Sequence, residues 1–147
     1  MSGTWDDIYD KLRGGMGTSV ALPPRIVEEL RPQFLDTAAA DTAACAFPAQ
    51  ERFANPMGML QGGIIAAAFD FVFGMLAFLQ VQRPCASVTL NLAYIRSLPA
   101  DGRAFTVEAR LRAAMRTMVF LEGTACDADG NVVATAATTM NVLRQEK

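Results

Sequence analysis

The residues best suited to chemistry lie close together, between Asn55 and Asp70. Gly62 and Gly63 open a predicted helix, whose first backbone N–H groups have no partner inside the helix and can bind an anion. Asp70 follows as the only charged residue of an apolar run, and its carboxylate can act as a nucleophile or a base. An anion-binding N–H and a carboxylate are the parts of an acyl-transfer site.

The composition excludes several classes of function. The chain contains no histidine, which excludes Ser-His and Cys-His triads, histidine bases and His-ligated metals within the chain. Thirteen basic and fifteen acidic residues give a net charge of −2, with no basic run, so we expect no nucleic-acid partner. Small-molecule chemistry without a metal or cofactor is the better expectation.

The three cysteines are odd in number and widely spaced. Cys45, Cys85 and Cys126 have small or apolar neighbours, which favours buried, reduced thiols over disulfides and predicts a cytoplasmic protein. The acidic N-terminal segment does not resemble a signal peptide.

The apolar run from Gly62 to Leu79 contains a single charge and is long enough to span a membrane. A central Asp70 would cost about 2.5 to 3.5 kcal/mol on insertion scales, and amphipathic strands follow, so we expect a buried helix and no membrane partner. Most of its Phe and Met side chains belong to the core, with one or two lining an acyl pocket.

The remaining elements follow from periodicity and turn residues. Residues 5–12 form a predicted helix that ends at residues 14–17, and Pro23-Pro24 starts a second short helix through Leu30. The sequence then predicts, in order, two short strands within 33–48, a long helix from 61 to about 79, strands over 87–95 and 105–112, and a hairpin of 118–126 with 132–143. In the 87–95 strand, Val88, Leu90, Leu92 and Tyr94 alternate against Ser87, Thr89, Asn91 and Ala93.

A helix that is apolar on nearly all sides must be covered, and an antiparallel sheet curled round it can do this. We therefore expect an α+β fold in which about six antiparallel strands form a curved sheet around one long central helix. Residues 1–147 are predicted to form a single domain, with 1–31 as an N-terminal helical extension.

These residues resemble the hotdog-fold acyl-CoA thioesterases, in particular the phenylacetate-pathway type within the 4-hydroxybenzoyl-CoA thioesterase superfamily. The resemblance covers roughly residues 33 to 143. Its specific part is the spacing of Asn55, Gly62, Gly63 and Asp70, with Ser87-Val88-Thr89-Leu90-Asn91 resembling the next strand. Where the family usually has histidine before the glycine pair, this chain has Gln61, whose amide can donate and accept but cannot carry a proton near neutral pH.

Thioester hydrolysis needs a polarised carbonyl and an attacking group. The Gly62 N–H can hold the developing oxyanion, and Asp70 can attack or activate water. The eight residues between them span about 12 Å at about 1.5 Å per residue of helix, which is too far for both to act on one carbonyl. The site therefore pairs Gly62 of one subunit with Asp70 of another, in a two-fold homodimer with antiparallel central helices; a dimer of dimers is compatible with this.

The other candidate residues have supporting roles. Asn55 and Ser87 are expected to position water or hydrogen-bond Asp70. Gly63, Met57 and Met59 are candidates for contacting the acyl-CoA substrate, and the guanidinium groups of Arg83, Arg96 and Arg116 are candidates for docking a coenzyme A phosphate.

Simpler interpretations remain open for the same residues. Without any role in catalysis, the glycine pair could serve to allow close helix packing and Gln61 could serve to cap the helix. Asn55 before Pro56 could be ordinary turn chemistry. An acyl-CoA hydrolase acting on an aromatic or short-to-medium acyl group is the leading hypothesis. The alternative is an acyl-CoA binding or sensing protein in which Gln61 marks lost or weak catalysis.

Overall fold

A computed structural model describes residues 4–16 and 20–144 of the chain. Two helices, α1 (Trp5–Met16) and α2 (Arg25–Leu30), precede the short strands β1 (Gln33–Leu35) and β2 (Thr42–Pro48). A 3-10 turn, η1 (Glu51–Phe53), leads to the long helix α3 (Gly62–Val81). Four strands complete the fold: β3 (Cys85–Tyr94), β4 (Ala104–Ala114), β5 (Met118–Cys126) and β6 (Val132–Val142).

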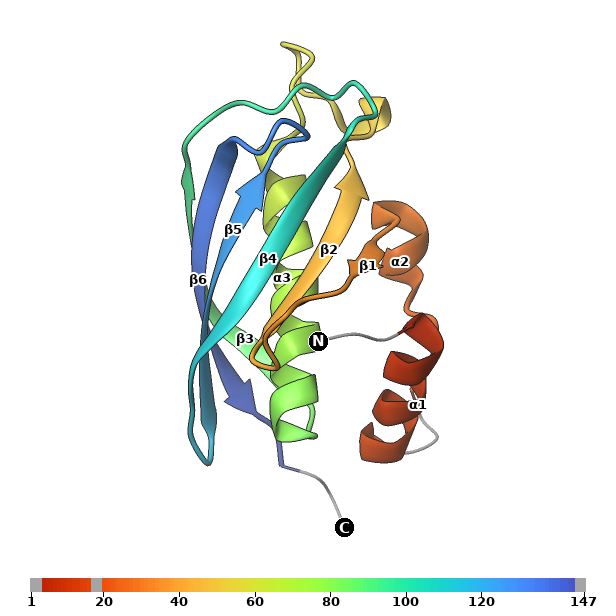
Figure 1. Ribbon diagram of the computed structural model, residues 1–147, viewed down its shortest axis with the longest axis vertical. Coiled ribbons are helices and arrows are strands. Elements are labelled where there is room, and N and C mark those ends of the chain that lie inside the picture. Colours follow the sequence, from red (N-terminus) through yellow and green to blue (C-terminus); the bar gives the residue numbers. More distant parts are fainter. Residues whose placement is uncertain (1–3, 17–19, 145–147) are drawn as a thin grey trace.

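The six strands form one antiparallel sheet in the order β1-β2-β4-β5-β6-β3 (Figure 1). The predicted β5–β6 hairpin is confirmed, and Met118 of one strand pairs with Asn141 of the other. The ten-residue strand β3 crosses to the far edge, where β6 is its only neighbour among the described strands. One long edge of the sheet is therefore left with unpaired backbone groups.

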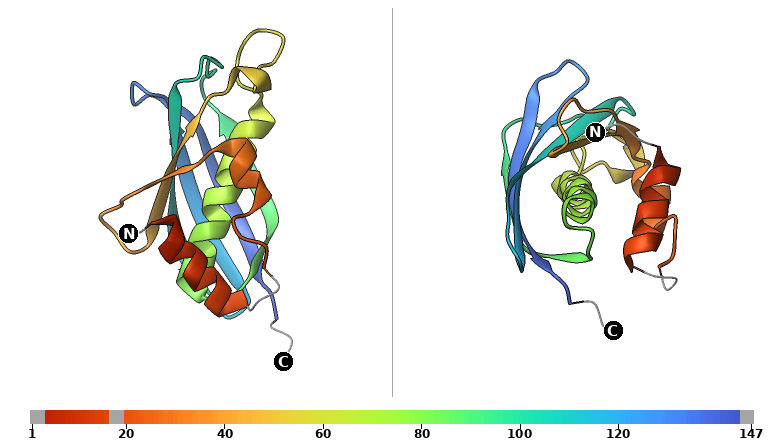
Figure 2. Two further views of the ribbon diagram at one scale, coloured as in Figure 1. Left: turned by 90° about the vertical axis from the view of Figure 1, so that its right-hand side faces the viewer. Right: turned by 60° about the horizontal axis from the view of Figure 1, so that its bottom comes forward.

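Helix α3 lies in the concave side of the sheet, which curves around it (Figure 2). The buried face of α3 includes Phe69, Phe73 and Leu76, which are completely shielded from solvent. They pack against inward side chains of the strands, such as Val107 and Leu121. The predicted α+β fold, with its long helix inside a curved sheet of six strands, is confirmed.

Helix α3 lies between the sheet on one side and helix α1 on the other (Figure 2). Ile8 of α1 is buried, and Trp5 makes a T-shaped contact with the ring of Phe71 on α3. Helix α1 ends at Met16, within the predicted range of residues 14–17, after continuing through Gly14 and Gly15. Residue 17 lies outside the described residues. Helix α2 begins after Pro24, close to the predicted start.

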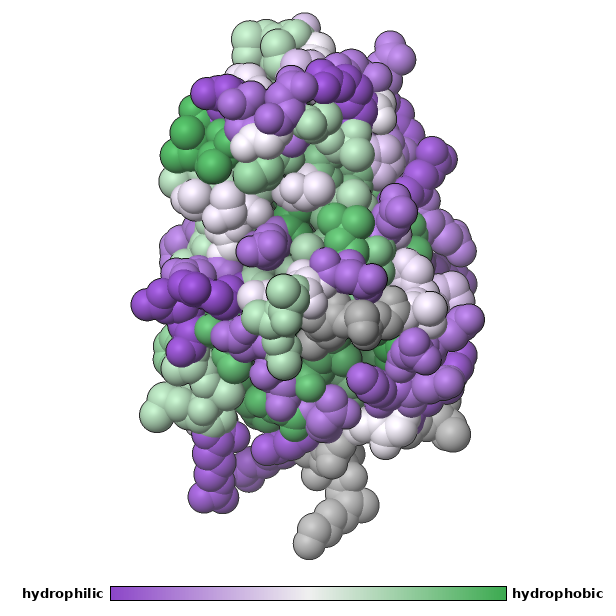
Figure 3. All heavy atoms as spheres, viewed as in Figure 1, coloured by the Kyte–Doolittle hydropathy of each residue, from purple (hydrophilic) through white to green (hydrophobic). Residues whose placement is uncertain are grey.

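Helix α3 is long and apolar enough to pass the length and composition test for a membrane span, but half of its most apolar window is buried in the protein. Its packing is that of a core helix. On the face shown in Figure 3, hydrophilic side chains cover most of the right-hand side, and hydrophobic groups lie at the left edge and between the purple areas.

The three cysteines are free thiols, but they are not equally buried. Cys45 is fully shielded in β2, and burial raises the pKa of its thiol to about 12. Cys85 and Cys126 are only partly buried, so the prediction of three buried thiols is wrong for these two.

Candidate active site

Backbone hydrogen bonds to two other segments, η1 and the loop after β3, hold the chain just before α3. The Gln61 N–H donates to the Phe53 carbonyl at 2.9 Å, and the Leu60 N–H donates to the Leu98 carbonyl at 2.7 Å. Within the described residues, the N–H groups of Gly62 and Gly63 have no acceptor, as expected for a first helical turn. The structure therefore presents two donors at the positive end of a twenty-residue helix.

The two glycines differ in their surroundings. A Cβ atom at Gly62 would lie 3.2 Å from the ring of Tyr94, whose hydroxyl donates to the Gly62 carbonyl at 2.7 Å. Close packing therefore explains Gly62 within one chain. A Cβ atom at Gly63 would meet nothing within 4 Å, so packing inside the chain gives no reason for glycine there.

Tyr94 was not among the predicted site residues. The alternating pattern of β3 placed it on the inward face, but no signal in the sequence indicated that its hydroxyl reaches the first turn of α3.

Gln61 occupies the N-cap position, but its side chain is exposed and makes no capping hydrogen bond. The interpretation of Gln61 as a side-chain cap is therefore wrong. Its amide group stays beside the free N–H donors.

Asn55 shapes the loop that leads into α3. Its side-chain oxygen accepts the backbone N–H groups of Met57 at 2.9 Å and Met59 at 3.1 Å. Its backbone also bonds Gly58 and Met59. These are turn contacts, and they place Asn55 near Gly62 of its own chain, away from Asp70.

Asp70 lies in the middle of α3 and is exposed in the single chain. The hydroxyl of Ser87, on β3, donates to Asp70 Oδ1 at 2.6 Å. This distance is typical of a charge-assisted O–H···O⁻ bond, and it fixes one carboxylate oxygen while leaving the other free. The predicted contact between Ser87 and Asp70 is present in the structure.

A β-bulge at Val88 makes this contact possible. The pairing of β3 with β6 shifts register between Ser87 and Thr89, and Val88 is 58% exposed. Strict alternation had placed Val88 on the buried face and Ser87 on the opposite face, and the structure corrects both positions. The additional residue reverses the side-chain direction, so Ser87 faces α3.

The predicted substrate-contacting residues fall into different places. Met59 is partly buried beside Gly62 and lines a small cavity of about 220 Å³ together with Arg96 and Tyr94. Met57 is 77% exposed on the loop before α3.

Arg83 and Arg116 lie at the other end of β3. Arg83 donates to the Leu143 carbonyl at 2.9 Å, and Arg116 is exposed in the turn between β4 and β5. That turn bonds the end of β6 through the Thr117 carbonyl and the Val142 N–H, and Val142 pairs with Cys85 at the start of β3. The structure thus places Arg96 beside Gly62. Arg83 and Arg116 lie near the start of β3, the end of that strand from which Ser87 bonds Asp70.

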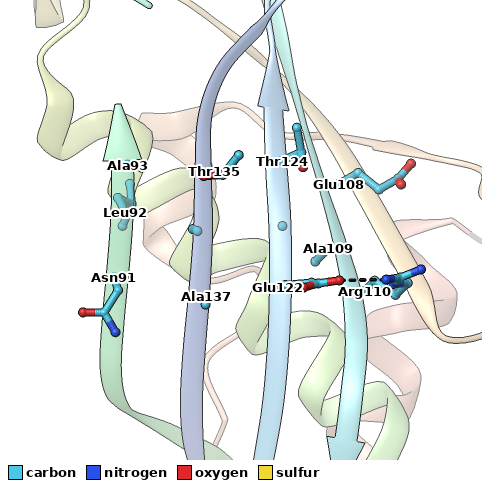
Figure 4. A pocket seen from close by; sticks show the side chains of 12 residues that line it. Asn91, Leu92, Ala93, Glu108, Ala109, Arg110, Glu122, Thr124, Thr135 and Ala137 are labelled. Atoms are coloured by element: carbon cyan, nitrogen blue, oxygen red, sulfur yellow. Dashed lines mark hydrogen bonds and ion pairs between the residues drawn. The ribbon is translucent and has the colours of Figure 1, made fainter. Parts of the chain in front are cut away.

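Two of the larger cavities bear on the location of the site. One, of about 680 Å³, lies on the outer face of the sheet, where Figure 4 shows the ion-paired Glu122 and Arg110 side chains pointing toward each other. It is separated from Asp70 by the sheet. The other, of about 360 Å³, lies between α1 and α3 and includes Asp70 in its wall. Among the residues that the structure describes, no group of three or more Cys, Asp and Glu side chains could hold a metal ion.

A long helix inside a curved antiparallel sheet of six strands is the hotdog fold. The family model of the thioesterase superfamily matches residues 57–134, and the chain belongs to that superfamily. The protein is a thioester hydrolase of this family.

Known relatives agree with this assignment. A protein of Saccharolobus solfataricus assigned as an esterase is 33% identical over 102 residues, which cover 69% of this chain and 72% of that protein. The phenylacetic acid degradation-related protein of Ralstonia eutropha JMP134 has 28% identity and a TM-score of 0.74, covering 90% of this chain and 98% of that one. The E. coli PaaI protein from the phenylacetic acid degradation operon shares the fold, with a TM-score of 0.79 at 12% identity and 95% of both chains covered.

Proposed function

We propose that the protein hydrolyses an aromatic or short-to-medium-chain acyl-CoA to the free acid and CoA, at a site shared between two subunits. The observation that carries this proposal is the Ser87–Asp70 hydrogen bond, which orients a carboxylate with one free oxygen. The free N–H of Gly62 supplies the complementary group, an oxyanion donor.

The two groups cannot serve one carbonyl within one chain. Eight residues of α3 separate them, or about 12 Å along the helix axis. They also lie at opposite ends of β3, since Asp70 bonds Ser87 and Gly62 bonds Tyr94. A second copy of the chain is needed to bring a Gly62 N–H to Asp70.

The exposed edge of β3 is the proposed interface of that dimer. Long unpaired edges are pairing sites, and antiparallel pairing of two β3 strands obeys a two-fold axis. Because the bulge adds one residue, Ser87 and Tyr94 each lie three ladder positions from Asn91: they pair with Met140 and Ala134 of β6, and Asn91 pairs with Ala137 at the midpoint. A two-fold axis at that midpoint puts Ser87 and Asp70 opposite the partner subunit's Tyr94 and the partner subunit's Gly62.

The chemistry requires only these groups and water. Asp70 either attacks the thioester carbon, forming an acyl-carboxylate anhydride that water then hydrolyses, or removes a proton from water as it attacks the carbon. In both routes the carbonyl oxygen becomes negative beside the Gly62 N–H, and the C–S bond breaks to release the CoA thiolate. Gln61 can hydrogen-bond the thioester but cannot exchange a proton with it. We propose no cofactor.

The substrate class is supported by the relatives and by the position of Arg96. Two structural relatives are named for phenylacetic acid degradation, which supports an aromatic acyl group. The Arg96 side chain lies beside the Gly62 cavity, where it can bind a phosphate of CoA. An acyl-CoA substrate also fits a cytoplasmic protein with free thiols.

A panel of acyl-CoA esters tests the proposal. The purified protein should release thiol from at least one aromatic or short-to-medium acyl-CoA, and Asp70→Asn should lower this rate by about a thousandfold or more. Asp36→Asn changes an exposed carboxylate in the turn after β1 and should leave the rate unchanged. Wild-type turnover by Asp70→Asn contradicts the mechanism.

The alternative function is acyl-CoA binding or sensing, favoured by Gln61 in place of an ionisable side chain. Tight binding of an acyl-CoA without turnover supports it, whereas sustained hydrolysis excludes it. Light scattering at micromolar concentration should show a dimer or a dimer of dimers, and a monomer contradicts the shared site.

A further inference from the structure

The cavity between α1 and α3 has the properties of a binding site for a bulky hydrophobic group. Its volume is about 360 Å³, more than twice the roughly 150 Å³ of an apolar cavity that accepts benzene. Of the described residues that line it, Asp70 alone is charged. The proposed attacking group thus lies in the wall of an otherwise largely apolar cavity.

We infer that this cavity holds the acyl group and that α1 determines which acyl groups are accepted, namely arylacetyl and medium-chain groups in preference to acetyl. The inference rests on the proposed thioesterase function and specifies the substrate of the same site. It makes α1 the outer wall of the pocket.

Aromatic contacts fix this wall. The Trp5 ring stacks on Tyr9 one turn along α1, with centroids 5.7 Å apart. It also makes T-shaped contacts with Phe71 of α3 and Phe34 of β1, with ring centroids 5.8 and 5.9 Å away. Trp5 therefore links α1 to both α3 and the sheet, and a ring or chain in the cavity would lie against aromatic faces.

Gly74 supports the same assignment from the other side of the cavity. It lies inside α3, where glycine costs about 1 kcal/mol relative to alanine. A Cβ atom at Gly74 would meet nothing within 4 Å, so packing within the chain does not require glycine. Gly74 lines the cavity, and a side chain there would occupy the space that an acyl group needs.

Acyl-chain selectivity tests the inference. Each methylene buried in the cavity should raise kcat/KM about fourfold, so octanoyl-CoA and phenylacetyl-CoA should exceed acetyl-CoA by well over tenfold. Gly74→Leu should reduce the octanoyl-to-acetyl ratio at least tenfold. Gly14→Leu is the matched control, since Gly14 also lies in a helix with no atom within 4 Å of its Cβ position but does not line the cavity.

A binding measurement separates this inference from the proposed function. Trp5 is the only tryptophan of the chain, so its fluorescence reports directly on the cavity. In the Asp70→Asn variant, octanoyl-CoA and free octanoate should change the emission with saturation, and CoA alone should not.

The outcomes are distinguishable. Robust hydrolysis with a silent Trp5 and an unchanged ratio in Gly74→Leu overturns the pocket assignment and leaves the thioesterase intact. A saturable Trp5 response without hydrolysis of any acyl-CoA confirms the pocket and refutes the proposed function.

Discussion

Removing the Ser87 hydroxyl measures how strongly the active carboxylate is held. In Ser87→Ala, Asp70 loses the 2.6 Å hydrogen bond that fixes one of its oxygens. We expect kcat to fall while KM changes little, because the bond orients the attacking group and does not contact the rest of the substrate.

The size of the effect depends on whether a partner subunit covers the pair. Hydrogen bonds to charged groups are worth about 1.5 to 3 kcal/mol, which corresponds to about a 13- to 160-fold loss of kcat. In the single chain both side chains are exposed, and an exposed bond of about 0.5 to 1.5 kcal/mol would give only about a 2- to 13-fold loss. A dimer that excludes water from the pair predicts the larger range.

The kcat and KM of Ser87→Ala are measured by steady-state kinetics with the acyl-CoA of the panel that the wild type hydrolyses fastest. Thr135→Ala is the matched control, since it removes one hydroxyl from an exposed position on β6. Chemical denaturation should show both variants folded. A kcat for Ser87→Ala within twofold of wild type refutes the positioning role.

Three further changes test other parts of the structure. Phe73→Ala empties a fully buried site on α3 and should lower the free energy of unfolding by about 3 to 5 kcal/mol, measured by chemical denaturation. Arg96→Ala should raise KM for an acyl-CoA several-fold but leave KM unchanged for the same acyl group on N-acetylcysteamine, which has no phosphate. The backbone N–H of Asn131 lowers the pKa of Asp127 below its usual 3.8, so the charged carboxylate stabilises the β5–β6 turn above that pH, and this stability is lost as the pH falls through the folded pKa. Unfolding curves of wild type and Asp127→Asn should therefore differ by a constant amount above about pH 5 and converge below pH 3.8.

Much of the fold could be predicted because hydrophobic periodicity is strong where elements are long. The apolar run of α3 identifies that helix, and the alternation of Phe105, Val107, Ala109 and Leu111 identifies β4 and its inward face. The turn at Asp127 to Asn131 predicts the hairpin. The antiparallel sheet around one helix follows from the need to cover α3.

The local details that shape the site could not be predicted in this way. The bulge at Val88 breaks a regular alternation without any glycine or proline to mark it. The reach of the Tyr94 hydroxyl to the Gly62 carbonyl depends on how β3 crosses α3. Likewise, α1 runs through Gly14 and Gly15 despite their low helix propensity.

The central claim is that each active site combines two subunits, and mixed dimers test it most directly. Asp70→Asn removes the attacking carboxylate, and Gly62→Pro removes the N–H donor at a first-turn position where the proline backbone fits a helix. The Tyr94 ring, 3.2 Å from the new Cβ atom, must shift by a few tenths of an ångström, so circular dichroism of the Gly62→Pro homodimer checks its fold. Co-expression of the two variants with different affinity tags, followed by purification through both tags, isolates dimers that contain one chain of each.

In such a dimer one site carries both defects and the other carries none. We predict about half of the wild-type activity per dimer, although each parent homodimer is inactive. Recovered activity would also show that Gly62→Pro folds. Mixed dimers with no more activity than the two parents would contradict the shared site.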